Sequence, residues 1–261
     1  MPYNIDGLMM QHDFKSPRLF VDAPLNVGSR IALEREQGHY LGNVLRLGAG
    51  DSILVFNGHD GEWRAHIEGR KRLEHLILTE QIRPQETPCD LHLLFAPLKH
   101  ARLDYMVQKA VEMGASLLAP TLTQFTQVSR VNTARMRANA IEAAEQCGIL
   151  NLPEINEPQP LTRRLTERDG QRLLIFCDEA APLADPLKAL SANKPGGLDV
   201  LIGPEGGFSE EERTLLLRQP RLMRLSLGPR ILRADTAAVV ALALVQAALG
   251  DWGDPNRPDS R

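Results

Sequence analysis

The sequence is poor in cysteine and has no long hydrophobic run, and both absences limit what kind of protein it can encode. Its 3 cysteines, Cys89, Cys147 and Cys177, are scattered, and none belongs to a Cys-x-x-Cys pair or has zinc-type spacing to a histidine. Such a set is typical of reduced thiols in a cytoplasmic protein without a bound metal. No apolar stretch approaches the roughly 20 residues that a membrane span needs. No apolar run follows a basic start, so we expect no signal peptide.

The chain also lacks the positive charge of a protein that coats nucleic acid. Its formal net charge is −3, which argues against indiscriminate nucleic-acid binding but permits a local basic patch. We find no internal repeat, no low-complexity segment, no P-loop and no GxGxxG motif after the first expected strand. With 261 residues, 43% of them hydrophobic, the chain has room for one large globular domain or two smaller ones.

The region between residues 16 and 84 has the pattern of a small β-domain. Short apolar runs alternate with turn signals, and the clearest run, at residues 53–56, is followed by Asn57-Gly58 and then Asp60-Gly61. Such pairs tolerate the positive φ of tight turns, so the region predicts a small antiparallel barrel. Residues 39–45 break the pattern and predict one short helix. The polar residues 1–15 predict a flexible extension.

Beyond residue 84 the pattern changes to alternating strands and helices. A segment with two prolines, residues 83–88, predicts a linker before this change. The expected strands are residues 91–95, 117–122, 173–177, 200–202 and 225–227. The expected helices are residues 103–111, with Gly114 as the stop signal, 135–147, with Met136, Ile141 and Ala144 facing inward, and 236–249. This alternation predicts an α/β domain with a mainly parallel sheet over residues 85–250. A polar, frayed tail is expected at 251–261.

The strongest local motif is GPEGGFSEEE, from Gly203 to Glu212, which lies between an expected strand and an expected helix. Ser209 and Glu212 have the spacing of a capping box, which predicts where the helix starts. In open α/β sheets, ligands bind beyond the carboxyl ends of strands, and glycines there let a ligand lie against the backbone. From spacing alone, ligand binding and a plain tight turn are equally well supported.

A second motif, LSLGPRILRADTAA at residues 225–238, also leads from a strand through a loop into a helix, with Asp235 or Thr236 as the expected cap. Arginines gather around the two motifs: Arg213, Arg218, Arg221, Arg224, Arg230 and Arg233. The planar guanidinium suits phosphate, base or carboxylate recognition. For Arg213 and Arg218, salt bridges to nearby glutamates on a solvated face are the simpler interpretation. Arg230 and Arg233 lie in the loop, where a functional role is favoured.

Together, GPEGGFSEEE and LGPRILRADTA resemble the RsmE-type family of the SPOUT superfamily, which methylates N3 of a uridine in 16S rRNA. Similar segments follow in collinear order from residue 16 to residue 249, among them PRLFV at 17–21, HYL at 39–41, FNG at 56–58 and EAAEQC at 142–147. Members commonly carry an arginine where this chain has Ile149 and Leu150, so we assign no role to Ile149.

The resemblance implies a fold, an activity and partners. The fold would be a PUA-like β-barrel that binds RNA at residues 16–84, followed by a SPOUT methyltransferase domain with a deep trefoil knot. The activity would be S-adenosylmethionine-dependent rRNA (uracil-N3) methylation, acting on 16S rRNA within the assembled 30S subunit. The active site would use both subunits of a homodimer. Knots are nearly absent from proteins, so the resemblance alone supports this one.

The resemblance also assigns site residues. The cofactor is expected among three loops, against Cys177, Asp178, Glu179, Ile202, Gly203, Pro204, Glu205, Gly206, Gly207, Leu225, Leu227, Gly228, Ile231 and Leu232. RNA contacts are expected from Arg18, His39, Arg46, Lys99 and Arg230, although for His39 packing in the barrel or a surface hydrogen bond is the favoured interpretation.

For the chemistry, we expect Arg233, with Arg230 as second candidate, to stabilise the developing uracilate as donors do in an oxyanion hole. Asp235 and Glu205 are carboxylates placed to accept the N3 proton. Helix capping by Asp235, loop anchoring by Glu205 and direct proton loss to water stay open as alternatives. So do two other functions: a non-catalytic RNA-binding protein on the same fold, and a tRNA methyltransferase of the same superfamily.

Overall fold

The computed structural model describes residues 13, 15–69, 72–128, 130–193 and 196–252. The described residues form two compact units. Of these residues, the first unit contains those up to Thr87 together with Glu145–Asn151, and the second contains Pro88–Ala144 and those from Leu152 to Trp252. The expected extension and tail lie almost entirely outside the described residues. None of the helices in the described ranges is long and apolar enough to cross a membrane.

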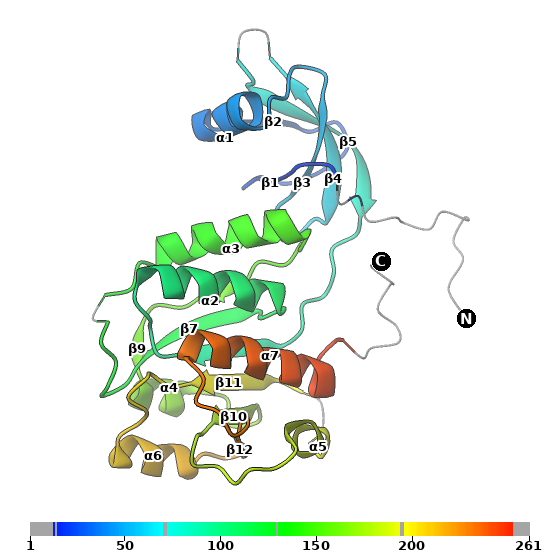
Figure 1. The fold of residues 1–261 in the computed structure, drawn as a ribbon. Coiled ribbons are helices and arrows are strands. Elements are labelled where there is room, and N and C mark those ends of the chain that lie inside the picture. The colour runs from blue at the N-terminus through cyan, green and yellow to red at the C-terminus, as the bar shows by residue number, and fades with distance from the viewer. Residues whose placement is uncertain (1–12, 14, 70–71, 129, 194–195, 253–261) are drawn as a thin grey trace, which may run out of the picture. The chain divides into compact units, whose positions relative to one another are not determined.

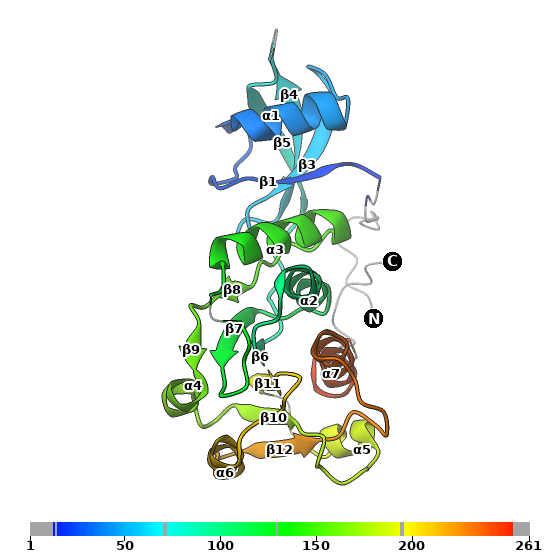
Figure 2. The same cartoon turned by 60° about the vertical axis from the view of Figure 1, so that its left-hand side comes forward.

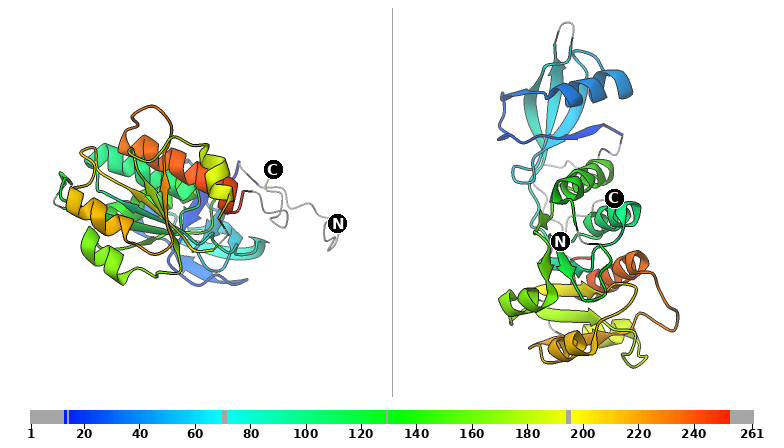
Figure 3. Two further views of the ribbon diagram at one scale, coloured as in Figure 1. Left: turned by 90° about the horizontal axis from the view of Figure 1, so that it is seen from below. Right: turned by 90° about the vertical axis from the view of Figure 1, so that its left-hand side faces the viewer.

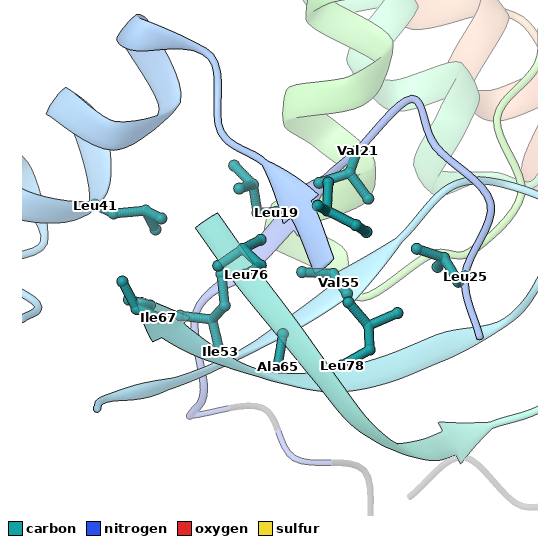
Figure 4. Close-up of a cluster of buried hydrophobic side chains, with 11 residues drawn as sticks. Leu19, Val21, Leu25, Leu41, Ile53, Val55, Ala65, Ile67, Leu76 and Leu78 are labelled. Atoms are coloured by element: carbon teal, nitrogen blue, oxygen red, sulfur yellow. The ribbon is translucent and has the colours of Figure 1, made fainter. Parts of the chain in front are cut away.

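The first unit is a curled five-stranded sheet around an apolar core (Figure 1). In the sheet order β1-β3-β4-β5-β2, its strands are β1 (Arg18–Phe20), β3 (Ser52–Phe56), β4 (Glu62–Glu68), β5 (His75–Arg83) and β2 (Arg30–Ala32). Alternation along β4 buries Ala65 and Ile67, while His66 between them faces solvent. Figure 4 shows the core side chains converging from the strands, among them Leu19, Ile53, Val55, Leu76 and Leu78, with Leu41 joining from a helical segment.

Two predictions for this unit are wrong. The sheet is not wholly antiparallel, because β1 pairs with β3 in parallel, with Leu19 opposite Val55. A parallel pair needs a long crossover rather than a tight turn, and β2 and a helical segment lie between these two strands in the sequence. That segment also starts earlier than predicted: α1 (Arg35–His39) runs into a π-helical turn, η1 (Tyr40–Val44). Its N-cap is Glu34, which is not among the residues that usually signal a helix start.

The second unit is built on a parallel sheet, as predicted. Its strand order is β12-β10-β11-β6-β7-β8, β9 pairs with β7, and every pairing is parallel. The strands are β6 (Leu91–Phe95), β7 (Leu117–Leu122), β8 (Glu154–Ile155), β9 (Gln159–Pro160), β10 (Leu173–Cys177), β11 (Leu198–Ile202) and β12 (Leu222–Leu225). All of β11 is buried, as expected for a central strand covered on both faces.

Helices cover both faces of this sheet: α2 (His100–Glu112), α4 (Leu161–Glu167), α5 (Pro186–Ser191), α6 (Glu210–Leu217) and α7 (Ala234–Leu249), with α3 (Thr133–Cys147) as the remaining helix. Figure 2 shows α2, α5 and α7 on one face and α4 and α6 on the other, and Figure 3 keeps this arrangement. The apolar stripe of α2 is buried, and Gly114, with φ at 76°, ends the helix as predicted.

Several elements of this unit differ from the prediction. The last strand is residues 222–225 rather than 225–227, so the residues after Leu225 belong to a loop. The short elements β8, β9, α4 and α5 had no clear pattern in the sequence and were not predicted. In α3 the inward positions are Met136, Ala140, Ala143 and Ala144, whereas Ile141 is only half-buried.

Candidate active site

A pocket of about 550 Å³ opens at one edge of the second unit's sheet. The strands β10, β11 and β12 are neighbours and run parallel, with Cys177 opposite Leu225 and Phe176 opposite Leu201. Their carboxyl ends therefore meet at this edge, where ligands of open α/β sheets bind. The volume lies within the range of small-molecule sites.

All the residues that the sequence pointed to as cofactor contacts line this pocket. They are Cys177, Asp178, Glu179, Ile202, Gly203, Pro204, Glu205, Gly206, Gly207, Leu225, Leu227, Gly228, Ile231 and Leu232. The pocket is also lined by residues that were not expected to contact the cofactor, among them Phe176, Ala180, Leu183, Phe208, Glu210, Arg213 and Ser226. The structure thus brings the three predicted loops together, while the contact of each residue with a cofactor stays a prediction.

The loop after β10 is held by an ion-pair cluster around Asp178, whose side chain is 1% exposed. Asp178 accepts two hydrogen bonds of 2.8 Å from Arg213 and one of 2.6 Å from Arg224. Burial raises the pKa of Asp178, but these guanidinium hydrogen bonds outweigh burial and leave the pKa below its ordinary value. The interpretation of Arg213 as part of a solvated face paired with its neighbouring glutamates is therefore wrong. The partner of Arg213 is Asp178, which is 35 positions away in the sequence. Helical spacing connects only residues three or four positions apart, so it could not predict this pair.

Cys177, at the end of β10, forms part of the pocket wall. Burial, with a smaller contribution from the Asp178 charge, raises the pKa of its thiol to about 12. The thiol is therefore protonated near neutral pH and is not a nucleophile, since the thiolate is the reactive form.

The glycine loop between β11 and α6 presents backbone to the pocket. Ser209 and Glu212 form the predicted capping box: the Ser209 hydroxyl accepts from the Glu212 N–H at 3.2 Å, and the Glu212 carboxylate accepts from the Ser209 N–H at 3.0 Å. Gly207 has φ at 71°, which favours glycine. A Cβ on Gly206 would lie 3.1 Å from Cβ of Phe125. Phe125, a 44% exposed aromatic residue on the loop after β7, had no signal in the sequence that pointed to this site.

The two carboxylates expected near the chemistry share one arginine that the sequence analysis also missed. Arg102, in the first turn of α2, donates from Nε and Nη2 to Asp235, at 3.0 Å each, and from Nη1 to Glu205. These hydrogen bonds hold the pKa of Asp235 below its ordinary value. The N-cap of α7 is Arg233, which makes no side-chain cap hydrogen bond, so neither Asp235 nor Thr236 caps this helix. Helical spacing along α2 gave no reason to single out Arg102.

Of the two loop arginines, Arg230 lines the pocket, whereas Arg233 is not among the lining residues. Arg230 and Arg233 are exposed, and between them Ile231 is 97% exposed. No described residue makes a side-chain hydrogen bond or salt bridge to Arg230 or Arg233, so both guanidiniums can meet a substrate. Gly228, at φ 104°, turns the chain into this segment.

The other RNA candidates differ in how accessible they are. In the first unit His39 and Arg46 are exposed, and Arg46 has a positive φ of 58°. Arg18 is buried against Glu62, with Nε 2.8 Å from Oε1, and it also donates to the Asp13 carbonyl. This placement contradicts a direct RNA contact for Arg18, because its guanidinium is committed inside the unit. In the second unit Lys99 is exposed at the N-cap of α2.

Comparison with known proteins identifies the family. Residues 85–246 match the RNA methyltransferase domain, and residues 33–78 match the PUA domain of RNA methyltransferases. The chain belongs to the RNA methyltransferase family. The resemblance drawn from the two loop motifs is thereby confirmed, and so is the α/β fold preceded by a PUA-like β-domain.

Similar members of this RNA methyltransferase family have been named and solved. Ribosomal RNA small subunit methyltransferase E of Rickettsia conorii is 31% identical over 89% of this chain and 96% of its own length. The enzyme of that name from Neisseria gonorrhoeae, solved bound to S-adenosylmethionine, matches with TM-score 0.77 and 26% identity over 91% of this chain and 99% of its own. A Legionella pneumophila structure, described as a methyltransferase with bound S-adenosylmethionine, matches with TM-score 0.80 and 30% identity over 91% and 99%.

Proposed function

We propose that this protein uses S-adenosylmethionine to methylate N3 of a specific uridine in 16S rRNA of the small ribosomal subunit. The observation that carries the proposal is the pocket at the ends of three adjacent parallel strands, lined by the loops that bear the two motifs. Support also comes from relatives named ribosomal RNA small subunit methyltransferase E and from two similar structures that hold this cofactor.

The residues present fit this cofactor. S-adenosylmethionine combines a flat adenine with a cationic sulfur and an amino-acid end, so it needs apolar surface, backbone groups and negative charge in one pocket. Leu227, Ile231 and Leu232 offer apolar surface, and Glu179 and Glu210 contribute negative charge to the wall. When bound, the cofactor supplies an activated methyl group.

The protein's own residues would expose and polarise the uracil. Extruding a base from its stack costs a few kcal/mol, and exposed arginines can offset this by holding phosphate or base oxygens. In the proposed mechanism Arg233 stabilises the negative charge that develops on O2 or O4 as N3 loses its proton. Alignment of the reacting atoms supplies much of the remaining rate.

The two carboxylates are not equivalent as proton acceptors. Asp235 uses both oxygens on Arg102, and its lowered pKa makes it a weak base. Glu205 is 46% exposed and accepts through Oε1 alone, while no described residue bonds to its Oε2. We therefore favour Glu205 over Asp235 as the group that takes the proton, with water as the alternative.

Partners follow from the same proposal. RNA contacts would come from His39 and Arg46 in the first unit and from Lys99 and Arg230 in the second, with the 30S subunit in the cytoplasm as substrate. We also propose a homodimer with a trefoil-knotted SPOUT domain. The inner side of α7 is buried, but its half-buried Val240 and Leu244 leave apolar surface for a second copy. A monomer mass in light scattering of a fully active preparation would refute the dimer.

The test is transfer of a labelled methyl group from S-adenosylmethionine to three substrates: 30S particles from cells lacking this gene, free 16S rRNA and tRNA. We expect label on the 30S particles. Label on tRNA alone would favour the tRNA alternative. No label on any substrate and no cofactor binding in calorimetry would indicate a non-catalytic RNA-binding protein.

A further inference from the structure

We propose that Arg102 is a positioning residue that fixes the glycine loop to the start of α7 and so aligns the two sides of the active site. The inference rests on the proposed function, because it concerns the alignment needed for methyl transfer. Arg102 does not line the pocket and is not offered as a group that touches cofactor or substrate.

The position of Arg102 follows from the sheet. β6 pairs with β11, with Phe95 opposite Ile202, and the Ala96 N–H donates to the Ile202 carbonyl at 3.0 Å. The chain therefore leaves both β6 and β11 at the edge of the sheet where the pocket opens. Helix α2 begins a few residues later at His100, which brings Arg102 to this edge in its first turn.

The guanidinium uses all three of its nitrogens on two carboxylates. Nε and Nη2 donate two hydrogen bonds of 3.0 Å to the Asp235 carboxylate, and Nη1 donates one to Glu205. The Arg102 side chain is 33% exposed and that of Asp235 is 16% exposed. Paired bonds of this kind fix orientation as well as distance, which a lysine cannot reproduce.

The two carboxylates belong to the two loops that must be aligned. Glu205 lies between Pro204 and Gly206 in the glycine loop, and Asp235 lies two residues after Arg233. In the described part of the chain, no other side-chain hydrogen bond or salt bridge links residues 203–208 to residues 226–236. Without Arg102, the two negative charges would repel each other and the loops would lose this connection.

If Arg102 is a positioning residue, its loss should change the rate of methyl transfer more than cofactor affinity. The predicted cofactor contacts lie in the loops themselves, so loss of Arg102 should weaken cofactor affinity less than it slows transfer. A misplacement of about 1 Å can cost on the order of a hundredfold in rate. A merely stabilising salt bridge would instead lower the unfolding midpoint and leave transfer at saturating cofactor unchanged.

The experiment compares Arg102→Ala and Arg102→Lys with Arg135→Ala as the matched control. Arg135 forms the same two-bond pair with Asp104, also on α2, but neither residue lines the pocket. Each protein is measured for thermal unfolding, for S-adenosylmethionine affinity by calorimetry, and for single-turnover transfer to 30S particles at saturating cofactor.

We expect Arg102→Ala to lose about a hundredfold in single-turnover rate and less than about tenfold in cofactor affinity. Arg102→Lys should recover only part of the rate, and Arg135→Ala should match the wild type. In Asp235→Asn, removing Arg102 as well should cost much less rate than it does in the wild type, because the two residues act through one contact.

A rate for Arg102→Ala within about threefold of Arg135→Ala would overturn the inference, as would full recovery by lysine. If Arg102→Ala does not fold, the comparison of Arg102→Lys with Arg135→Ala decides in the same way. Failure of the proposed function looks different: the wild-type protein itself would then transfer no methyl group to the particles.

Discussion

Arg213 and Asp178 form a two-bond ion pair in which Nη1 and Nη2 of the arginine each lie 2.8 Å from a carboxylate oxygen. Asp178 follows β10, and Arg213 lies on α6 behind the glycine loop. Arg224 on β12 adds a bond of 2.6 Å to the same carboxylate. One buried side chain thus connects the three segments whose loops line the pocket.

Replacing this carboxylate should cost both stability and cofactor binding. Asp178→Ala leaves two arginines without their partner, and removing one member of a buried pair costs about 3 kcal/mol of unfolding free energy. Urea unfolding and calorimetry with S-adenosylmethionine measure the two losses. Glu167→Ala is the control, because Glu167 belongs to an exposed pair with Arg163 within one helix and should change little. Equal unfolding free energies for both variants would contradict this account.

The same pair predicts how stability depends on pH. The pKa of Asp178 in the folded protein is below its ordinary value of 3.8, so its contribution is fully present above that value. The contribution is lost as the pH falls through the folded pKa. The difference in unfolding free energy between wild type and Asp178→Asn should therefore be constant from about pH 5 to pH 7 and shrink only below about pH 4. A difference that already shrinks between pH 7 and pH 5 would show that another group titrates.

Gly206→Val should abolish cofactor binding while the protein stays folded. A Cβ here would lie 3.1 Å from Cβ of Phe125, and a branched side chain would also fill space beside the backbone that lines the pocket. Calorimetry with circular dichroism tests both statements. Gly196→Val is the control, since a Cβ on Gly196 meets no atom within 4 Å.

A double variant distinguishes the two possible causes of lost cofactor binding in Gly206→Val, which are crowding against Phe125 and a side chain beside the pocket backbone. If crowding against Phe125 is the only problem, adding Phe125→Ala to Gly206→Val should restore binding. If the cofactor needs the bare backbone, as we predict, binding stays lost. Normal affinity in Gly206→Val itself would show that the loop is a plain turn.

Arg233→Ala should lower turnover far more than it weakens cofactor binding. Loss of one preorganised donor to a developing oxyanion costs on the order of a hundredfold in rate, and lysine should restore only part because it lacks the planar fork. Arg218→Ala, which removes an exposed arginine at the C-terminus of α6, is the control. Single-turnover transfer beside cofactor titration makes the measurement. Near-normal turnover of Arg233→Ala at saturating cofactor would remove Arg233 from the mechanism.

The sequence predicted the elements whose signals are local. β6, β7 and β10 have their predicted bounds, because each is a short apolar run in a buried parallel sheet. The Ser209 capping box and the Gly114 helix end were also predicted, since each depends on residues within a few positions of one another. The two loop motifs led to the pocket because they follow β11 and β12, the parallel strands on either side of β10 in the sheet.

What the sequence did not reveal depends on contacts between distant residues. Arg102 and Asp235 are 133 positions apart, and Arg213 and Asp178 are 35 apart, so no spacing rule connects either pair. Arg18, the first residue of β1, was expected to contact RNA, but the folded chain buries it against Glu62. The parallel pairing of β1 with β3 was hidden for the same reason, because turn signals predict hairpins and not crossovers.

The most direct test of the central claim is to locate the methyl group on the RNA. 30S particles from cells lacking this gene are incubated with the protein and S-adenosylmethionine, and their 16S rRNA is digested and mapped by mass spectrometry beside untreated particles. The account predicts one new methyl group, on N3 of a single uridine, that forms far more slowly when Arg233→Ala replaces the wild type. A methyl group on another atom or another base, or none at all from a protein that binds the cofactor, would contradict it.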